Sequence, residues 1–258
     1  MNETLSLLMN RKTVRKYSDQ PVTEAVKQAI LTATFRAPTA GAMMLYSIID
    51  VIDPSLKEQL AINCDHQPFI AKAPWLLLFL ADYQRWFDYY ETSDAASLCE
   101  AFNRQPRQPQ EGDFLLACMD ALIAAQTAVV AAESLGVGSC YIGDIIENYE
   151  KTKMLFNLPK YTAPVALLCF GYPVEAEKKR KMTSRFDKKY IYSENQYRRF
   201  SADELADMFP ETDKKAENPF AELPVGQQNY IRKFTADFSV EMSRSAREIL
   251  KNWQSDEN

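Results

Sequence analysis

The sequence is poor in glycine and in histidine, and both shortages limit what the protein can be. Seven glycines are spread over 258 residues, and three of them fall within residues 136–143. Because glycine lets a backbone approach a ligand closely, this cluster predicts a place where the chain meets one. The single histidine, His66, cannot supply a histidine-rich metal site, and no GxSxG motif accompanies it to build a hydrolase triad. We interpret His66 as an ordinary surface residue, so the chemistry of an enzyme with this sequence would be carried by a bound cofactor.

The cysteine content and the net charge also exclude classes of protein. The five cysteines, an odd number, include no CxxC pair, which suits a reducing cytoplasm better than a disulfide framework. The N-terminus lacks the long apolar region of a secretory signal. A net charge of −5 gives no general attraction to nucleic acid. We therefore expect a soluble cytoplasmic protein that binds neither nucleic acid nor membranes.

The most apolar segment predicts one long helix over residues 113–136. Asp113 would be its N-cap, and Gly136 would follow its end. Its length raises the question of a membrane span, but polar residues such as Asp120 and Glu133 favour a buried helix of a soluble protein.

Hydrophobic periodicity predicts the remaining elements. Continuous apolar runs bounded by turn residues indicate strands at 45–51, 75–81 and 164–171. Apolar residues at helical spacing indicate helices at 3–10, 23–37, 55–63, 84–105, 147–157 and 227–253. The last of these carries an apolar stripe that could pack on its own chain or on a partner.

Two basic clusters are the strongest candidates for ligand binding. Residues 11–16 hold four cations and residues 178–189 hold seven. A run of charge can simply be solvated, but two such clusters could also hold a phosphate between forked arginines. The small-residue turn at 38–42 and the glycine run at 136–143 could accept a planar ring, and together these features indicate a mononucleotide-like cofactor. No GxGxxG motif is completed, so neither a Rossmann domain nor a P-loop is predicted.

Six motifs occur in an order and spacing that resemble the nitroreductase family, in particular its NAD(P)H-dependent flavin reductase and oxygen-insensitive nitroreductase A branch. The motifs are RKTVRKY at 11–17, RAPTAGAMMLYSIIDV at 36–51, Gln67 followed by IAKAPWLLLFLAD at 70–82, AAESLGVGSCYIGDI at 131–145, LCFGYP at 168–173 and RFDKKYIYSENQY at 185–197. The resemblance covers roughly residues 5–200.

The resemblance implies an α+β fold with a central mixed β-sheet surrounded by helices, in an intertwined homodimer. Residues 1–200 would form the FMN-binding domain, and residues 201–258 a C-terminal excursion that belongs to it or embraces the partner chain. One FMN per chain would lie at the dimer interface. The helix at 113–136 would be the central dimer helix, so aspartate at Ala124 or Val129 is expected to abolish the dimer and flavin binding together.

The resemblance also implies which residues bind the cofactor. Those for the phosphate and ribityl chain are Arg11, Lys12, Thr13, Arg15 and Arg185, with Lys181 replacing the lysine that is usual at Thr183. Those lining the isoalloxazine from the partner chain are Pro38, Thr39, Ala40 and Ala42. Gln67 would bond the polar edge of the ring, and Tyr141, Ile142 and Gly143 would pack on it, with the Gly143 N–H near the flavin N5.

The sequence departs from the family pattern at four places. Ala42 stands where many relatives carry a flavin-contacting side chain, often asparagine, and Asp144 replaces a common glycine. Thr183 stands where a phosphate-binding lysine is usual. Residues 201–209 are acidic, whereas the branch selects NADPH with basic residues in its C-terminal excursion.

The implied function is an FMN-dependent oxidoreductase that transfers hydride from NADPH or NADH to flavin and then two electrons to a nitroaromatic, quinone or free flavin. The shared site implies ping-pong kinetics and no catalytic side chain. A non-catalytic flavin-binding or regulatory protein on the same fold is an alternative, as is a specialised reduction such as dehalogenation or flavin fragmentation. The physiological acceptor and the choice between NADH and NADPH stay open.

Overall fold

The structure is a computed structural model that describes residues 1–208, 219–220 and 222–254. The last residue of the acidic segment 201–209 and part of the predicted excursion 201–258 lie outside the described residues. The chain divides into two compact units. The first joins Met1–Arg180 to the chain from Glu241 onward, and the second comprises Lys181–Val240. The proposed division at residue 200 stays a prediction.

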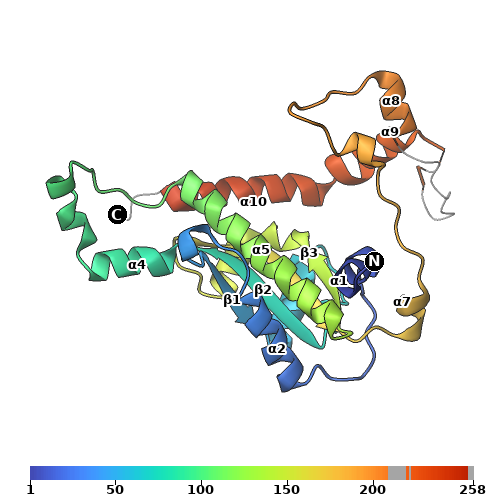
Figure 1. Cartoon of the computed structure of the whole chain (residues 1–258), viewed down its shortest axis with the longest axis horizontal. Coiled ribbons are helices and arrows are strands. Elements are labelled where there is room, and N and C mark those ends of the chain that lie inside the picture. The colour runs from blue at the N-terminus through green and yellow to red at the C-terminus, as the bar shows by residue number, and fades with distance from the viewer. Residues whose placement is uncertain (209–218, 221, 255–258) are drawn as a thin grey trace. The chain divides into compact units, whose positions relative to one another are not determined.

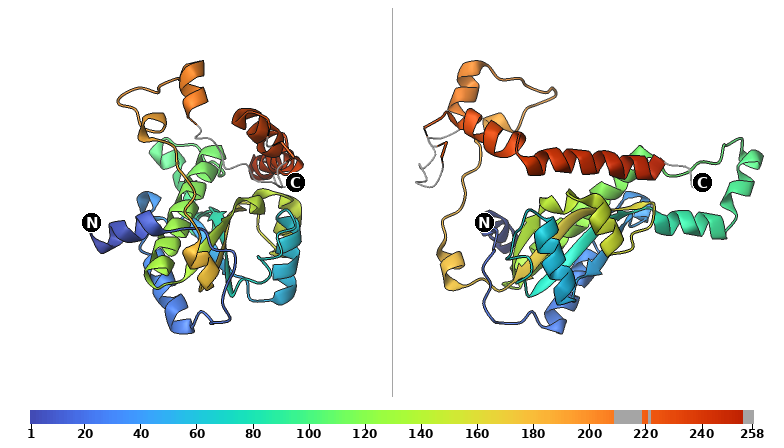
Figure 2. Two further views of the ribbon diagram at one scale, coloured as in Figure 1. Left: turned by 90° about the vertical axis from the view of Figure 1, so that its right-hand side faces the viewer. Right: turned by 180° about the vertical axis from the view of Figure 1, so that it is seen from behind.

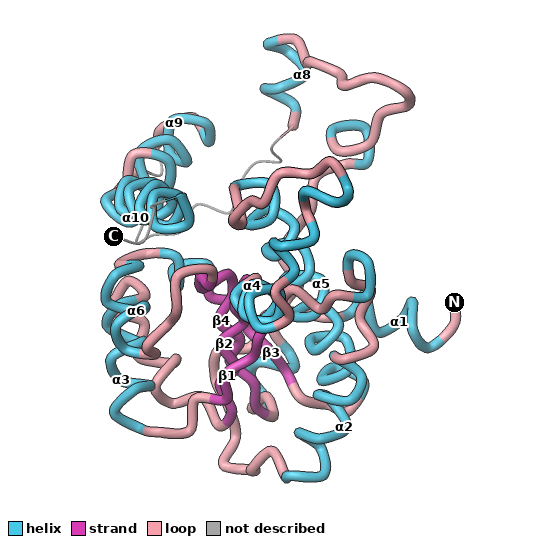
Figure 3. The backbone as a smooth tube through the Cα atoms, turned by 90° about the vertical axis from the view of Figure 1, so that its left-hand side faces the viewer, coloured by secondary structure: helices cyan, strands magenta, loops and turns pink. Residues whose placement is uncertain are grey.

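A four-stranded sheet forms the centre of the first unit, with strand order β1-β2-β4-β3 (Figures 1 and 3). The strands are β1 (Tyr46–Asp50), β2 (Trp75–Asp82), β3 (Gly138–Ile142) and β4 (Thr162–Gly171). Neighbouring strands pair antiparallel throughout. The four strands thus form an antiparallel sheet, whereas the resemblance implies a mixed one. Among the described residues, parallel pairing occurs in the isolated bridge between Thr13 and Ser139.

The two central strands follow from their apolar runs. Every residue of β2 and of β4 is buried, which confirms the expectation of strands covered on both faces. The edge strand β3 was not predicted, because residues 136–143 were interpreted as a glycine run that meets a ligand. Gly138 begins β3 where a Cβ would lie 2.5 Å from Cγ2 of Val14, so the missing side chain allows the N-terminal segment to approach the strand.

Helices cover both faces of this sheet. α3 and α6 lie on one side of the strands, and α2 and α5 on the other (Figure 3). α1 contacts α5 (Figure 2). The bounds in this unit are α1 (Glu3–Asn10), α2 (Glu24–Thr34), α3 (Pro54–Asn63), α4 (Gln84–Thr92), α5 (Glu111–Ser134), α6 (Tyr149–Leu155), α7 (Glu175–Lys179) and α10 (Asp237–Gln254), which starts in the second unit.

Two predicted helices are shorter than expected. The helix predicted at 84–105 ends at Thr92, and Asp94 in the left-handed region (φ 51°) separates it from short 3-10 turns. The helix predicted at 227–253 is interrupted before Asp237, because a π-helical turn at Tyr230–Phe234 precedes α10. Further along α10, Trp253 is buried with its ring centroid 5.0 Å from that of Phe114.

The long helix α5 begins earlier than the sequence indicates. Gln110 is its N-cap, and Asp113 instead completes a capping box by accepting a hydrogen bond from the Gln110 N–H. The expectation that Asp113 is the N-cap is therefore wrong. Gly136 follows the C-cap with φ 74°, which confirms it as the residue that ends the helix.

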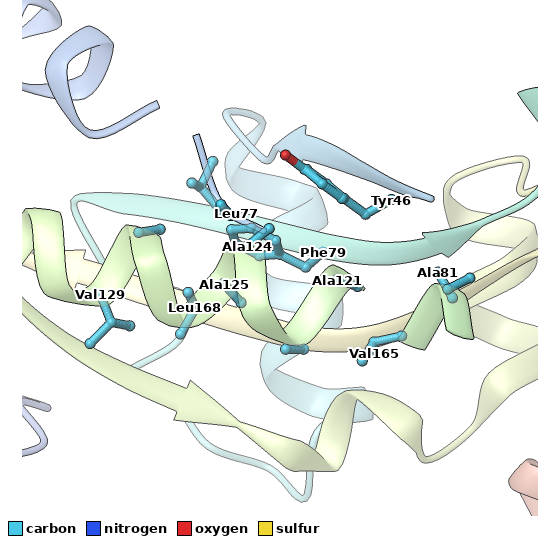
Figure 4. Close-up of a cluster of buried hydrophobic side chains, with 14 of the residues drawn as sticks. Tyr46, Leu77, Phe79, Ala81, Ala121, Ala124, Ala125, Val129, Val165 and Leu168 are labelled. Atoms are coloured by element: carbon cyan, nitrogen blue, oxygen red, sulfur yellow. The ribbon is translucent and has the colours of Figure 1, made fainter. Parts of the chain in front are cut away.

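The two faces of α5 differ in the size of their side chains. The buried face is made of small residues that lie on β2 and β4 (Figure 4). Ala124 and Val129 belong to this face and are fully buried in their own chain. The expected effect of aspartate at these positions on the dimer and on flavin binding stays a prediction. The opposite face exposes Leu115, Met119, Leu122 and Ile123. α5 is long and apolar enough to cross a membrane by length and composition, but here it packs as a core helix.

The second unit contains short elements. They are a 3-10 turn at Lys188–Tyr190, α8 (Ala202–Asp207), α9 (Val225–Asn229) and the π-helical turn. Asp207 accepts from Lys189 Nζ at 3.1 Å and from the Tyr190 hydroxyl at 3.1 Å, which ties α8 to the first of these turns.

Candidate cofactor site

The N-terminal basic segment, Arg11–Tyr17, runs beside the edge strand β3. The Val14 N–H donates to the Ser139 carbonyl at 2.8 Å, and the Tyr17 hydroxyl donates to the Val14 carbonyl at 3.1 Å. α1 ends just before this segment, so the chain leaves the helix in a conformation that can pair with a strand. The fold thus places the first basic cluster next to the glycine run, as a phosphate-and-ring site requires.

The cations of this segment are used in different ways. Lys12 Nζ donates to the carbonyls of Lys178 and Arg180, at 2.5 and 2.9 Å, and Arg180 in turn donates to the Thr13 carbonyl. The exposed guanidinium of Arg15 lies 5.7 Å from the ring centroid of Phe69. Lys12 therefore closes a loop of its own chain, while Arg15 stays accessible to an anion.

Arg11 lies close to the end of α5 and to β3. Burial raises the pKa of Glu133, and the charges of Arg11 and Lys12 oppose that rise. Burial likewise raises the pKa of Tyr141 above its ordinary range, with Arg11 again opposing. These effects place the Arg11 charge beside the segment that the resemblance assigns to the ring.

The end of β3 exposes backbone. Gly143 is exposed and Tyr141 keeps 37% of its surface exposed, whereas Ile142 between them is buried in the core. A Cβ built on Gly143 would meet nothing within 4 Å. The chain thus offers open backbone at Gly143, next to the basic segment, where a flat ring could lie.

Gln67 contacts the residue that follows this backbone. Its Nε2 donates to Asp144 Oδ2 at 2.6 Å and to the Cys64 carbonyl at 2.9 Å. The sequence placed Gln67 near the ring but assigned Asp144 no role beyond a departure from the family. In the sequence, the only sign of a role for Asp144 is its departure from the family pattern.

The small-residue turn at 38–42 is held by the buried Asp120 of α5. Its carboxylate accepts from the Thr39 hydroxyl and from the N–H groups of Ala40 and Leu45, each of the latter at 3.0 Å. The Thr39 hydroxyl accepts from the Met44 N–H at 2.8 Å. Sequence reasoning missed Asp120 as a residue that shapes the turn, although an acidic residue inside an apolar helix is a signal of a buried polar contact.

The turn and the basic segment lie beside different parts of α5 within one chain. Asp120 contacts the turn, and Glu133 lies near the basic segment. The helix between Asp120 and Glu133 is about 20 Å long at a rise of 1.5 Å per residue. The structure therefore brings together Arg11–Arg15, Gln67 and Tyr141–Gly143, but not Pro38, Thr39, Ala40 and Ala42 with them.

The second basic cluster is divided between the two units. Lys181, Thr183 and Arg185 belong to the second unit, whose position relative to the first is not defined. Within that unit, Arg185 Nη1 donates to Thr183 Oγ1 at 2.7 Å and to the Ser184 carbonyl at 3.0 Å.

The chemistry of these groups fits FMN. The accessible guanidinium of Arg15, with Arg11 nearby, suits a phosphate. Open backbone at Gly143 suits a flat ring, and the amide of Gln67 suits the ring's polar edge.

Comparison with known proteins is consistent with this site. The model of the family described as "Nitroreductase family" matches residues 8–172. An oxygen-insensitive NADPH nitroreductase of Salmonella typhimurium is 31% identical over 76% of this chain and 75% of its own length, and an FMN reductase (NADPH) of Bacillus subtilis is 29% identical over the same shares. A crystal structure of an oxidoreductase from Bacteroides fragilis aligns with a TM-score of 0.82 at 28% identity, covering 96% of this chain and 98% of that one. The chain belongs to the nitroreductase family.

Proposed function

We propose that the protein is an FMN-dependent oxidoreductase that uses NAD(P)H to reduce a small-molecule acceptor: a nitroaromatic, a quinone or free flavin. The observation that carries this proposal is the basic segment Arg11–Tyr17 beside the open backbone of Tyr141–Gly143. Relatives named FMN reductase (NADPH) and oxygen-insensitive NADPH nitroreductase support the same reaction class.

The roles of the residues follow from their surroundings. Arg11 and Arg15 bind the phosphate, since charged donors to phosphate make the strongest hydrogen bonds available here. Thr13 supports the ribityl chain, and Lys12 holds the loop closed. When bound, FMN supplies the two-electron chemistry, accepting hydride from NAD(P)H and then reducing the acceptor.

Tyr141, Ile142 and Gly143 shape the surface on which the ring lies. Because no side chain stands at Gly143, the ring can lie directly on this backbone. Its other face is then left for a nicotinamide and afterwards for an acceptor, which predicts ping-pong kinetics. Backbone N–H groups and the Arg15 charge offset the negative charge that reduction adds to the site.

The protein acts as a homodimer in this proposal. The exposed apolar face of α5 needs a cover, and a second copy of the chain provides it. The same pairing brings the Pro38–Ala42 turn of one copy to the basic segment of the other, which one chain alone keeps about 20 Å apart along α5. Lys181, Thr183 and Arg185 would join the phosphate site from the second unit.

The cytoplasm is the proposed location. All five cysteines are free thiols, which suits a reducing compartment.

Anaerobic titration of the purified protein tests the proposal. We expect one FMN per chain, and loss of the yellow colour when NADPH or NADH is added under argon. Protein that takes up no added FMN would overturn the proposal. Protein that binds FMN but is reduced by neither nucleotide would instead favour the non-catalytic alternative.

A further inference from the structure

The amide of Gln67 is held at both of its hydrogens. Nε2 donates to Asp144 Oδ2 at 2.6 Å and to the Cys64 carbonyl at 2.9 Å. The Gln67 backbone N–H donates to the Ala61 carbonyl at 2.8 Å, so the residue is fixed at the main chain as well.

These partners decide which way the amide faces. A carbonyl oxygen cannot donate, and a carboxylate only accepts, so neither partner could receive Oε1 in place of the NH₂ group. A flipped amide would set Oε1 against two acceptors. The orientation therefore follows from the chemistry of Asp144 and Cys64, and it leaves Oε1 as the one polar atom that Gln67 can offer to a ligand.

Glu147 is a buried carboxyl group near Asp144. Glu147 is buried, and its Oε1 has no hydrogen-bond partner in the part of the chain that the structure describes. Burial, followed by the carboxylates of Asp144, Asp65 and Glu241, raises the pKa of Glu147 to about 7. Glu147 thus holds its proton mainly below pH 7, and this limits the negative charge packed beside Asp144.

We propose that Asp144 is a positioning residue that locks Gln67 with its carbonyl oxygen toward the cofactor, so that Gln67 recognises an N–H donor on the polar edge of the isoalloxazine. On the oxidised ring the only such donor is N3–H. This inference rests on the proposed binding of FMN. It gives the departure at Asp144 a function, because glycine at that position would leave the Cys64 carbonyl as the one acceptor that orients the amide.

Binding of FMN and of 3-methyl-FMN, which lacks the N3–H donor, tests the proposal through quenching of flavin fluorescence. We expect the wild-type protein to bind FMN at least about tenfold more tightly, the ratio expected for one well-placed hydrogen bond. In Asp144→Ala that ratio should fall below about threefold, because an amide held by one acceptor instead of two can turn its NH₂ group to the ring. In Asp144→Asn it should be largely restored, since the asparagine oxygen can still accept from Nε2.

Glu147→Gln is the matched control, because it changes the neighbouring carboxyl but leaves both acceptors of Gln67 in place. Its ratio should match the wild type. A ratio unchanged in Asp144→Ala, in protein whose circular dichroism is unchanged, would overturn the inference, and so would a wild-type protein that binds both flavins equally. Failure of the wild type to bind either flavin would instead refute the proposed function.

Discussion

The hydroxyl of Thr39 donates a hydrogen bond to the carboxylate of Asp120, across 81 residues of sequence. The same carboxylate accepts from the N–H groups of Ala40 and Leu45, so one buried side chain holds the whole turn that leads into β1. The turn is short, small and mostly exposed, and without this contact its backbone would have few ordered partners.

Replacing Asp120 by alanine should therefore loosen the turn and destabilise the protein. The buried N–H groups lose their acceptor, which is expected to lower the free energy of unfolding by about 2–4 kcal/mol. Urea denaturation measures this change. Glu58→Ala, an exposed position on α3, should cost less than about 0.5 kcal/mol; equal losses in the two variants would contradict this role for Asp120.

Ala42 should be a weak point of the same turn. Its φ of 58° lies in the left-handed region, which costs a residue with a Cβ about 1 kcal/mol or more. Ala42→Gly should raise the melting temperature slightly, and Ala42→Asn should do the same because asparagine tolerates this region. Ala42→Val should lower it, since a β-branched residue fits this region poorly; a rise in all three variants would show that the strain lies elsewhere.

The exposed face of α5 predicts the dimer interface. Lysine at Met119 or Leu122, which are 57% and 46% exposed, should produce a folded monomer that has lost its flavin. Light scattering after size-exclusion chromatography reports the mass, and absorbance reports the flavin. Met154→Lys places the same charge on an exposed apolar residue of α6 and should leave the dimer intact. A flavin-loaded monomer would contradict the shared site.

The basic segment should discriminate between phosphorylated and unphosphorylated flavin. Arg15→Ala should weaken FMN binding by about tenfold or more, the range expected for a lost hydrogen bond to a charged group, and change riboflavin binding little. Isothermal titration with both ligands measures the difference. Lys16→Ala, an exposed cation in the same segment, should have a smaller effect. Equal losses for FMN and riboflavin would mean that Arg15 acts through the fold rather than through the phosphate.

Glu147 should make stability depend on pH near neutrality. Its pKa rises from an ordinary value of 4.5 to about 7 on folding, so the folded protein binds more protons than the unfolded chain between these values. The contribution of Glu147 is therefore present below pH 4.5 and is lost as the pH rises through 7. Denaturation between pH 5 and 8 should give a flatter profile for Glu147→Gln than for the wild type.

Glu150→Gln is the control for that measurement. The hydrogen bond from Arg244 lowers the pKa of Glu150, so this group contributes stability that is lost only as the pH falls below its ordinary range. Its removal should leave the slope between pH 5 and 8 unchanged. A Glu147→Gln profile parallel to the wild type would contradict the shift assigned to Glu147.

Elements with a local signal in the sequence can be predicted without the structure. Continuous apolar runs identify β2 and β4, helical spacing and a terminal glycine identify α5, and ordered motifs identify the family. β3 escaped detection, since its one glycine, Gly138, allows a close approach to Val14 that no local pattern expresses.

Which side chains act together depends on how distant segments of the chain pack. The apolar pattern of α5 runs nearly all round the helix, so packing alone shows that Ala124 faces the sheet and Leu122 faces outward. Gln67 and Asp144 are 77 residues apart, and their hydrogen bond exists because α3 and β3 end at the same place in the fold. Hydrogen bonds of that kind depend on angles and distances between distant segments, which periodicity and composition do not specify.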